Sequence, residues 1–207
     1  MISVITGLPG MGKTVILVSK GIQALKQGKD VYSNVQFDFS LCPSMQRYEK
    51  NFHYVDDMRQ IVGTVENALL LIDEMSVVFD AFTMYNLPPS VWANFRQHRK
   101  DGVDIVGTSQ SFNDFAYPIQ RLVQYEYRIL SRLSRFITVS VLNPRSKERF
   151  GRRFYYRSGL ISRLYNTNQR VGECDDLPIL IEDLYVPVLK GIQELNIKMM
   201  DMLKLDV

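Results

Sequence analysis

A glycine-rich stretch near the start of the chain has the residue types and spacing of a phosphate-binding loop. Residues 7–14 read Gly-Leu-Pro-Gly-Met-Gly-Lys-Thr and match the pattern G-x-x-x-x-G-K-[ST] in full. Glycines let backbone N–H groups curl around phosphate oxygens without interference from Cβ atoms. In this pattern Lys13 reaches the β- and γ-phosphates, and the hydroxyl of Thr14 binds Mg²⁺. We therefore expect ATP and Mg²⁺ as ligands, with ATP held by Gly7, Leu8, Pro9, Gly10, Met11, Gly12, Lys13 and Thr14.

Two neighbouring carboxylates could complete a site for phosphate chemistry. Asp73 and Glu74 directly follow the apolar run at residues 68–72, which is typical of a strand buried on both faces of a parallel sheet. Ligands of such sheets bind beyond the carboxyl ends of the strands. We expect Asp73 to hold Mg²⁺, usually through water, and Glu74 to act as the general base that polarises the attacking water.

Polar residues also end the next apolar run, at residues 103–107. In one large class of ATPases, the strand after the acidic pair lies between that pair and the phosphate-loop strand. Side chains at its tip then contact the γ-phosphate or the attacking water. Here the tip reads Thr108-Ser109-Gln110. We expect Gln110 to be this sensor, with Ser109 as the second choice, and an ordinary polar loop is the alternative.

The remaining apolar patterns predict the elements that position these groups. Extended segments are predicted at residues 2–6, 30–34, 52–55, 68–72, 103–107, 125–130, 136–142 and 154–156. Helices are predicted at residues 14–25, 91–99, 113–123 and 184–205, with a short one capped by Asp56 and ending at residue 61. Strands that alternate with helices predict an α/β fold. We expect a P-loop NTPase of the additional-strand, RecA- and FtsK-like class, with a mostly parallel sheet, helices on both faces and a C-terminal helix.

Charge is distributed unevenly along the chain. Residues 121–170 contain 12 Lys and Arg against 2 Asp and Glu, although the whole chain has a net charge of only +3. Aromatic residues alternate with these cations, a combination that suits a nucleic-acid backbone and unpaired bases. The alternative is that the aromatic residues belong to the core and the arginines bind an acidic protein. DNA and an acidic protein partner therefore both stay open for residues 121–170.

The chain offers few ligands for a structural metal ion and few cysteines for disulfides. It contains two cysteines, Cys42 and Cys174, and two histidines, His53 and His98. A zinc site and a disulfide framework are not expected, and a reducing cytoplasm is the simplest setting. No signal-peptide pattern and no apolar stretch of about 18 residues occurs. We expect a cytoplasmic protein, in a host cell if it is viral, unless a partner recruits it to a membrane or a virion.

The order of the motifs resembles the N-terminal domain of the zonula occludens toxin (Zot) family, which includes the filamentous-phage assembly ATPase. Gln97-His98-Arg99-Lys100 stands where that family has a basic cluster, and Leu164-Tyr165-Asn166-Thr167 resembles the Tyr-Asp-Thr that closes its ATPase region. The resemblance covers about residues 1–170. It rests on residues 7–14, 69–74, 92–105 and 110.

This resemblance implies an ATP-hydrolysing motor, encoded by a virus or phage, that packages a genome or assembles and extrudes virions. Filamentous-phage relatives continue into a transmembrane helix and an outer domain to which toxin activity is assigned. This chain ends at Val207, and we expect neither direct membrane anchoring nor toxin activity. A small-molecule kinase and a non-catalytic nucleotide-dependent adaptor remain alternatives. Glu74 counts against the kinase, because a kinase must avoid activating water.

Ring-shaped ATPases supply an arginine from a neighbouring subunit to the transition state. We therefore expect a homo-oligomeric ring, with Arg99 as the candidate arginine and with Arg96 and Arg121 beside it as further candidates. Capsid or membrane assembly proteins are further candidate partners. The chain is divided into an ATPase domain at residues 1–170 and a helical appendage at residues 171–207.

Overall fold

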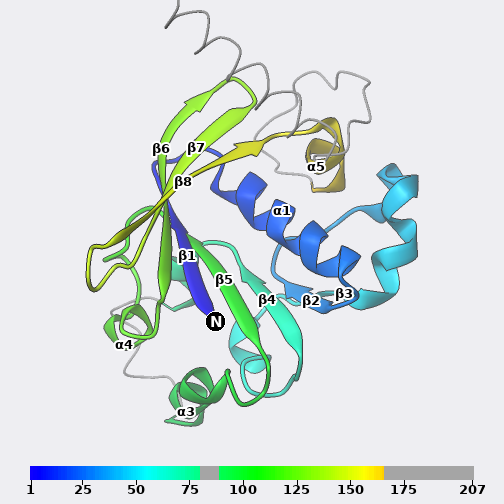
Figure 1. Ribbon diagram of the computed structural model, residues 1–207. Helices are drawn as coiled ribbons and strands as arrows, with labels where there is room; N and C mark the ends of the chain where they lie inside the picture. Colours follow the sequence, from blue (N-terminus) through cyan, green and yellow to red (C-terminus); the bar gives the residue numbers. More distant parts are fainter. Residues whose placement is uncertain (80–88, 166–207) are drawn as a thin grey trace, which may run out of the picture.

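An eight-stranded sheet runs through the computed structural model, which describes residues 1–79 and 89–165 (Figure 1). The strands lie in the order β3-β2-β4-β5-β1-β6-β7-β8. Their bounds are β1 Ile2–Thr6, β2 Asp30–Ser33, β3 Phe52–Tyr54, β4 Ala68–Ile72, β5 Asp104–Ser109, β6 Tyr125–Leu133, β7 Phe136–Leu142 and β8 Arg149–Tyr156.

Strands β3, β2, β4, β5, β1 and β6 pair in parallel, and only β7 and β8 are added as antiparallel neighbours among the described strands. The predicted mostly parallel sheet is thereby confirmed. Strand β5 lies between β4 and β1, as the sequence predicted for the strand after the acidic pair. Because parallel strands end at the same edge, the tips of β1, β2, β4 and β5 meet there.

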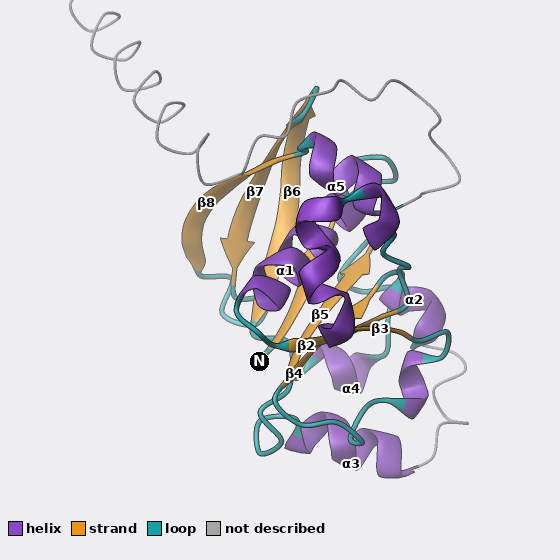
Figure 2. Ribbon diagram, turned by 90° about the vertical axis from the view of Figure 1, so that its right-hand side faces the viewer, coloured by secondary structure: helices purple, strands orange, loops and turns teal. Residues whose placement is uncertain are grey.

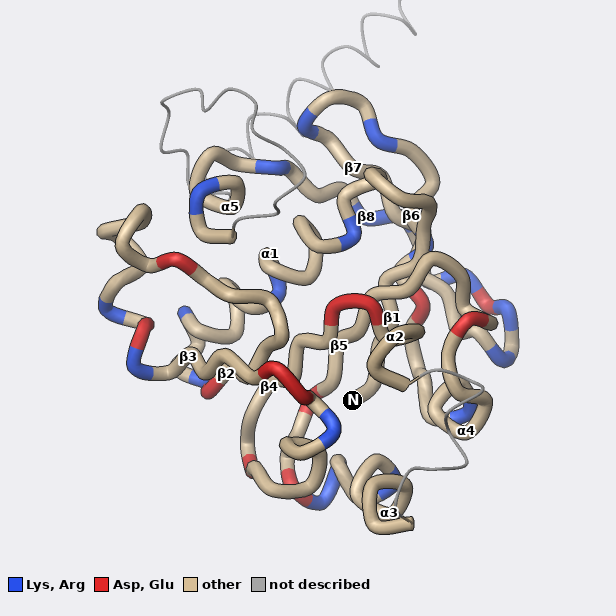
Figure 3. Tube along the Cα trace, turned by 180° about the vertical axis from the view of Figure 1, so that it is seen from behind, with Lys and Arg blue, Asp and Glu red and all other residues tan. Residues whose placement is uncertain are grey.

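Helices cover both faces of the sheet, as predicted (Figures 1 and 2). One apolar cluster packs α1 (Lys13–Lys26), α5 (Gly159–Leu164) and the 3₁₀ helices η1 (Phe39–Leu41) and η2 (Pro43–Asn51) against one face. The other face carries η3 (Met58–Gln60), α2 (Met75–Val78), α3 (Pro89–Gln97) and α4 (Tyr117–Gln120), which Figure 3 shows from behind.

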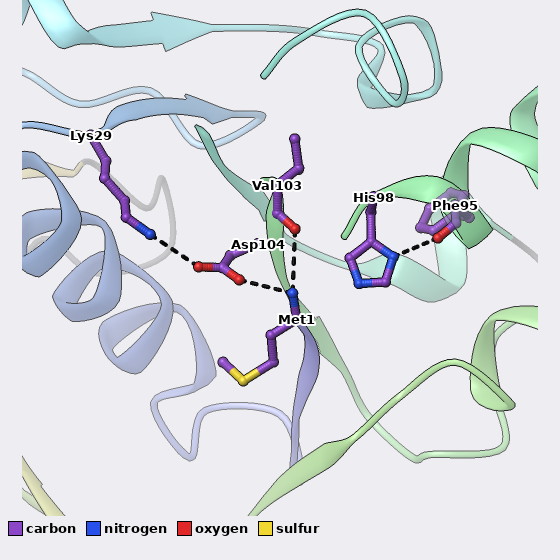
Figure 4. Close-up of polar contacts among 6 residues, drawn as sticks. All are labelled: Met1, Lys29, Phe95, His98, Val103 and Asp104. Carbon is purple, nitrogen blue, oxygen red and sulfur yellow. Dashed lines mark hydrogen bonds and ion pairs between the residues drawn. The ribbon is translucent and has the colours of Figure 1, made fainter. Parts of the chain in front are cut away.

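Polar contacts join the first residues of β1 and β5 at the edge opposite the strand tips (Figure 4). The Met1 amino group donates to the Val103 carbonyl at 3.3 Å and pairs with Asp104 at 2.8 Å, and Lys29 reaches the same carboxylate at 3.1 Å. Burial opposes ionisation of Asp104, but these two cations outweigh it and hold the pKa of Asp104 below its usual value. The contacts fix where the parallel pairing of β1 with β5 begins.

The predicted helix at residues 113–123 is wrong in length, because the helix there, α4, covers only Tyr117–Gln120. Pro118 lies in its first turn, where a missing N–H costs nothing. In the middle of a helix over residues 113–123, Pro118 would lack the N–H for its hydrogen bond and its ring would clash with the preceding turn, so the helix begins only after Ala116, whose ψ of 122° is not helical. Before it, the Ser111 amide donates to Asp114 at 2.8 Å and forms a turn.

Smaller differences come from short helices that have no apolar periodicity. Asp57, not Asp56, caps the turn at Met58–Gln60 by accepting from the Arg59 amide at 3.1 Å. Helices η1, η2, α2 and α5 were not predicted, because each is either 3₁₀ or at most six residues long. The helix predicted at residues 184–205, the appendage at 171–207 and Cys174 lie outside the described residues.

Within the part of the chain that the structure describes, none of the helices combines the length and apolar character needed to cross a membrane.

Candidate functional site

The glycine-rich segment forms a loop between the tip of β1 and the start of α1. Gly10 and Gly12 have φ angles of 75° and 95°, a region that residues with a Cβ rarely adopt. The Gly7 amide donates to the Gln110 carbonyl at 3.2 Å, which ties the loop to the tip of β5. The N-terminus of α1 therefore opens directly onto the loop, which is the geometry that binds phosphate.

Lys13 lies inside the curve of this loop, with only 8 % of its surface exposed. Its Nζ donates to the carbonyls of Gly7 at 2.9 Å and Leu8 at 3.3 Å. These contacts hold the ammonium group against the concave side of the loop. A phosphate cradled by the loop amides would therefore meet a positive charge already in place.

Thr14 and Asp73 bring two oxygen ligands together although they lie 59 residues apart in the sequence. The Thr14 hydroxyl, in the first turn of α1, is 3.2 Å from Oδ2 of Asp73, which directly follows β4. Hydroxyl and carboxylate oxygens suit Mg²⁺, which is commonly held by few protein ligands together with water and phosphate oxygens. The oxygens of the two residues predicted to hold the metal ion, Thr14 and Asp73, therefore fit it.

Two side chains that the sequence did not single out fix Asp73 from both neighbouring strands. Asn34, just after β2, accepts from the Asp73 amide at 2.7 Å and donates to the Asp73 carbonyl at 2.9 Å. Thr108, on β5, donates to Oδ1 of Asp73 at 2.5 Å. The carboxylate is thus oriented by hydrogen bonds that only the strand order β2-β4-β5 can bring together.

Glu74 turns the chain away from β4 in an unusual backbone conformation. Its φ is 56° and its ψ is 57°, the left-handed region, which costs a non-glycine residue about 1–3 kcal/mol. Its amide donates to the Thr108 hydroxyl at 2.9 Å, and its side chain is exposed. Thr108 therefore contacts both acidic residues, and the Glu74 side chain at the tip of β4 is accessible to solvent.

Gly107 leaves the space in which the helix after Glu74 begins. A Cβ atom at Gly107 would overlap the side chain of Met75, which is fully buried as the first residue of α2. Only a glycine on β5 allows α2 to approach this closely. A glycine inside an apolar strand is the sequence signal that could have indicated this approach.

The candidate sensors lie at the tip of β5 in different environments. The Ser109 hydroxyl is buried and donates to the Ser111 carbonyl at 2.8 Å, and the Gln110 side chain is exposed. Gln110 contacts the loop through its carbonyl, which accepts from Gly7. Thr108 is the residue of this tip that contacts the acidic pair, and the sensor role of Gln110 stays a prediction.

The β6–β7 hairpin packs against the side of the phosphate loop. A Cβ at Gly7 would lie 3.1 Å from Ile129 on β6, and one at Gly12 would lie 2.5 Å from Ile137 on β7. Near the hairpin tip, the Arg132 guanidinium donates to the carbonyl of Gly10. The structure thus places an arginine of the same subunit at the loop, which the sequence did not indicate.

A buried acid lies beside the base of the loop. Glu126 on β6 is 2 % exposed, and Oε1 accepts from the Thr6 hydroxyl at 2.6 Å. Arg128 donates to both carboxylate oxygens of Glu126, each at 3.1 Å. The paired charge lets a carboxylate stay buried where β1 leads into the loop.

Arg99 lies at the other end of the sheet, beyond the C-terminus of α3. The Val103 amide before β5 donates to the His98 carbonyl at 2.8 Å, which places this segment beside the first residues of the strands. Arg96 and Arg99 line a cavity there together with Gln124. These arginines are therefore remote from the phosphate loop of their own subunit.

The family comparison gives one match, to the model described as Zonular occludens toxin (Zot), over residues 1–141. No curated protein sequence matches the chain. Among solved structures, the N-terminal domain of zonular occludens toxin from Neisseria meningitidis is similar, with a TM-score of 0.53 and 19 % identity. The match covers 80 % of this chain and 98 % of that one.

The genome packaging NTPase B204 of Sulfolobus turreted icosahedral virus 2, in complex with ATP-gammaS, is also similar. Its TM-score is 0.51 at 11 % identity, over 74 % of this chain and 96 % of that one. At these identities the likeness concerns the fold. The predicted P-loop NTPase fold is thereby confirmed, with the loop and the acidic pair at the edge where strands of this fold bind their ligands.

Proposed function

The chain belongs to the zonular occludens toxin (Zot) family, and from this premise we propose that it is an ATP-hydrolysing motor for phage or virus assembly. One observation carries the proposal. The phosphate loop, the Thr14–Asp73 pair and the exposed Glu74 carboxylate meet at one edge of the sheet. The similarity to a viral genome packaging NTPase supports the same reading through its shared fold. The motor would package a genome or assemble and extrude virions.

Each residue of the site has a distinct role in this proposal. The loop amides and Lys13 bind the phosphates, and Thr14 and Asp73 hold Mg²⁺, which supplies charge neutralisation at the phosphates. Glu74 accepts the proton of the attacking water, and Thr108 and Asn34 keep Asp73 and Glu74 in position. A general base contributes about 10²–10⁴-fold to the rate of such a step.

The first test is ATP turnover without any phosphate acceptor. We expect the purified protein to release inorganic phosphate from ATP and Mg²⁺ alone, because the proposed base, Glu74, would activate water. Phosphate release is measured with and without a chelator, which should abolish it. A small-molecule kinase would need an acceptor, and an adaptor would bind ATP without turnover even with DNA present. Either result would contradict the motor.

Two arginines are candidates for charge stabilisation, and they differ in the subunit that they would serve. Arg132 contacts the phosphate loop of its own subunit. Arg99 lies at the opposite end of the sheet, so it could reach only the site of a neighbour in a ring. We propose that Arg132 acts in its own subunit, and we retain Arg99 as the arginine that a neighbouring subunit supplies.

Mixing variants separates these two roles. Arg99→Ala and Arg132→Ala should each lower turnover about 10²–10³-fold, as for loss of one donor to a developing charge. In a ring, an active site needs Lys13 from its own subunit and Arg99 from the neighbouring subunit. In an equal mixture of the Arg99→Ala and Lys13→Ala variants, about one quarter of the interfaces of a random ring combine both intact groups, so turnover should be partly restored. Mixing Arg132→Ala with Lys13→Ala should restore nothing, since both defects lie in the same site. Recovery of turnover in the Arg132→Ala mixture would contradict a role of Arg132 in its own subunit. No recovery in the Arg99→Ala mixture would contradict Arg99 as the arginine that a neighbouring subunit supplies.

The compartment and the partners of the motor also remain proposals. We propose that it works in the cytoplasm of the host cell as a homo-oligomeric ring. Capsid or membrane assembly proteins would recruit it to a virion or a membrane. DNA, contacted through residues 121–170, is the polymer that we propose it moves.

A further inference from the structure

Two adjoining cavities lie beside the antiparallel strands, away from the phosphate loop. Their volumes are about 480 Å³ and about 490 Å³, and both are lined by Tyr125 and Phe150. We call the two together the basic groove. Its cationic lining residues are Lys20, Arg96, Arg99, Arg145, Arg152 and Arg153.

The six cations of the basic groove come from distant parts of the sequence. Lys20 lies on α1, Arg96 on the last turn of α3 and Arg99 just beyond it, and the other three lie on β8 and the loop before it. No Asp or Glu lines either cavity, and none of the six forms an ion pair within the described residues. Figure 3 shows Lys and Arg recurring along β6–β8 and their loops. The groove therefore carries positive charge that the described fold does not neutralise.

Lys20 illustrates how this charge is held. Its Nζ lies 4.0 Å from the centre of the Tyr127 ring, and the Arg153 guanidinium lies 5.9 Å from the same centre. Burial, together with the nearby charge of Arg153, lowers the pKa of Lys20 to about 8. Lys20 and Arg153 thus lie near the same Tyr127 ring, and no acidic side chain lines the cavity beside them. An anion bound in the groove would reduce the repulsion between these two cations.

An aromatic side chain stands where the two cavities adjoin. Phe150 is 52 % exposed, and its ring contacts that of Tyr125 edge-on with centroids 5.4 Å apart. An exposed phenyl ring between arginines offers a surface on which a nucleobase can stack. An acidic protein segment would use the cations but would gain little from this ring.

We propose that the basic groove binds single-stranded nucleic acid, with phosphates on its cations other than Arg99, which the proposed ring places at a neighbour's ATP site, and with a base on Phe150. The proposal rests on the proposed function, because this strand would be the polymer that the motor moves. It also revises which cations contact that polymer. Arg128 is paired with Glu126 and Arg132 contacts the phosphate loop, so both are engaged elsewhere although they belong to residues 121–170. Arg96 and Lys20 lie outside that block but line the groove.

The test is fluorescence anisotropy of a labelled oligothymidylate with the full chain, without nucleotide, at about 50 mM and about 200 mM salt. Neutralising about five phosphates predicts a loss of affinity of about 10²-fold between the two conditions. Arg145→Glu and Arg153→Glu should each weaken binding about tenfold or more, and Phe150→Ala about tenfold through lost stacking. Two exposed lysines outside the groove serve as charge-matched controls, Lys50→Glu and Lys100→Glu.

Three outcomes would overturn the proposal. One is no binding at low salt, and another is equal weakening by the groove and control variants. The third is displacement of oligothymidylate by polyglutamate at equal charge concentration, which would make an acidic protein the occupant. ATP turnover without DNA is measured on the same preparations, and Lys50→Glu and Lys100→Glu should keep the basal rate. Absent turnover in every preparation would instead count against the proposed motor, so the two failures are distinguishable.

Discussion

Replacing Lys13 by alanine should lower ATP turnover by at least about 10²–10³-fold and weaken ATP binding. Lys13 is the one side-chain cation within the loop sequence, and it lies almost buried against the carbonyls of Gly7 and Leu8. Its loss leaves the negative charge of the phosphates to the backbone amides alone. Phosphate release and equilibrium binding of a fluorescent ATP analogue measure the two effects.

The matched control is Lys26→Ala, at the last turn of the same helix, where the side chain is exposed. It removes an equal charge and should leave turnover unchanged. Circular dichroism of both variants checks that the fold is retained. Normal turnover in the Lys13 variant would contradict the assignment of residues 7–14 as the ATP site.

Replacing Glu74 by glutamine should leave ATP bound and reduce its cleavage about 10²–10⁴-fold. The amide has nearly the same shape as the carboxylate but cannot accept a proton from water. The backbone of Glu74, with its left-handed conformation and its hydrogen bond to Thr108, is not altered by this change. Binding and turnover should therefore separate, unlike in the Lys13 variant.

Glu66→Gln is the control for this second change. Glu66 is an exposed acid two residues before β4, whereas Glu74 lies two residues beyond its end, so the same chemical change is made at opposite ends of one strand. The control should cleave ATP at the normal rate. If the Glu74 variant does so as well, another group is the base.

The parts of the site that were predictable are those encoded by local sequence. The loop at residues 7–14 follows from its glycine spacing, and the strand at residues 68–72 follows from an uninterrupted apolar run, with bounds that the structure reproduces. Both patterns involve residues next to one another in the chain. Asp73 and Thr14 could then be paired in advance, because strand tips in a parallel sheet share one edge.

The parts that were missed depend on which strands become neighbours. Asn34 and Asp73 are 39 residues apart, and a lone Asn after a short strand carries no motif of its own. Arg132 contacts Gly10 across 122 residues through the hairpin that joins β6, which is parallel to β1, to the antiparallel strand β7. From the composition, Arg132 and Arg153 belong to one basic block at residues 121–170. In the structure, Arg132 contacts the phosphate loop, whereas Arg153 lines the basic groove.

If the basic groove binds the polymer, strand β6 would link polymer binding to nucleotide binding. Tyr125 and Tyr127, near its start, line the basic groove, and Ile129 and Arg132, further along, contact the phosphate loop. β6 pairs with β1 as far as Arg128 and with β7 along its length, so one strand connects the lining of the groove to the side of the loop. Linkage of this kind is reciprocal. If bound nucleic acid tightens ATP binding by some factor, bound ATP must tighten the binding of that nucleic acid by the same factor. Cleaving the nucleotide would then loosen the grip on the polymer, which is the alternation that directional movement requires.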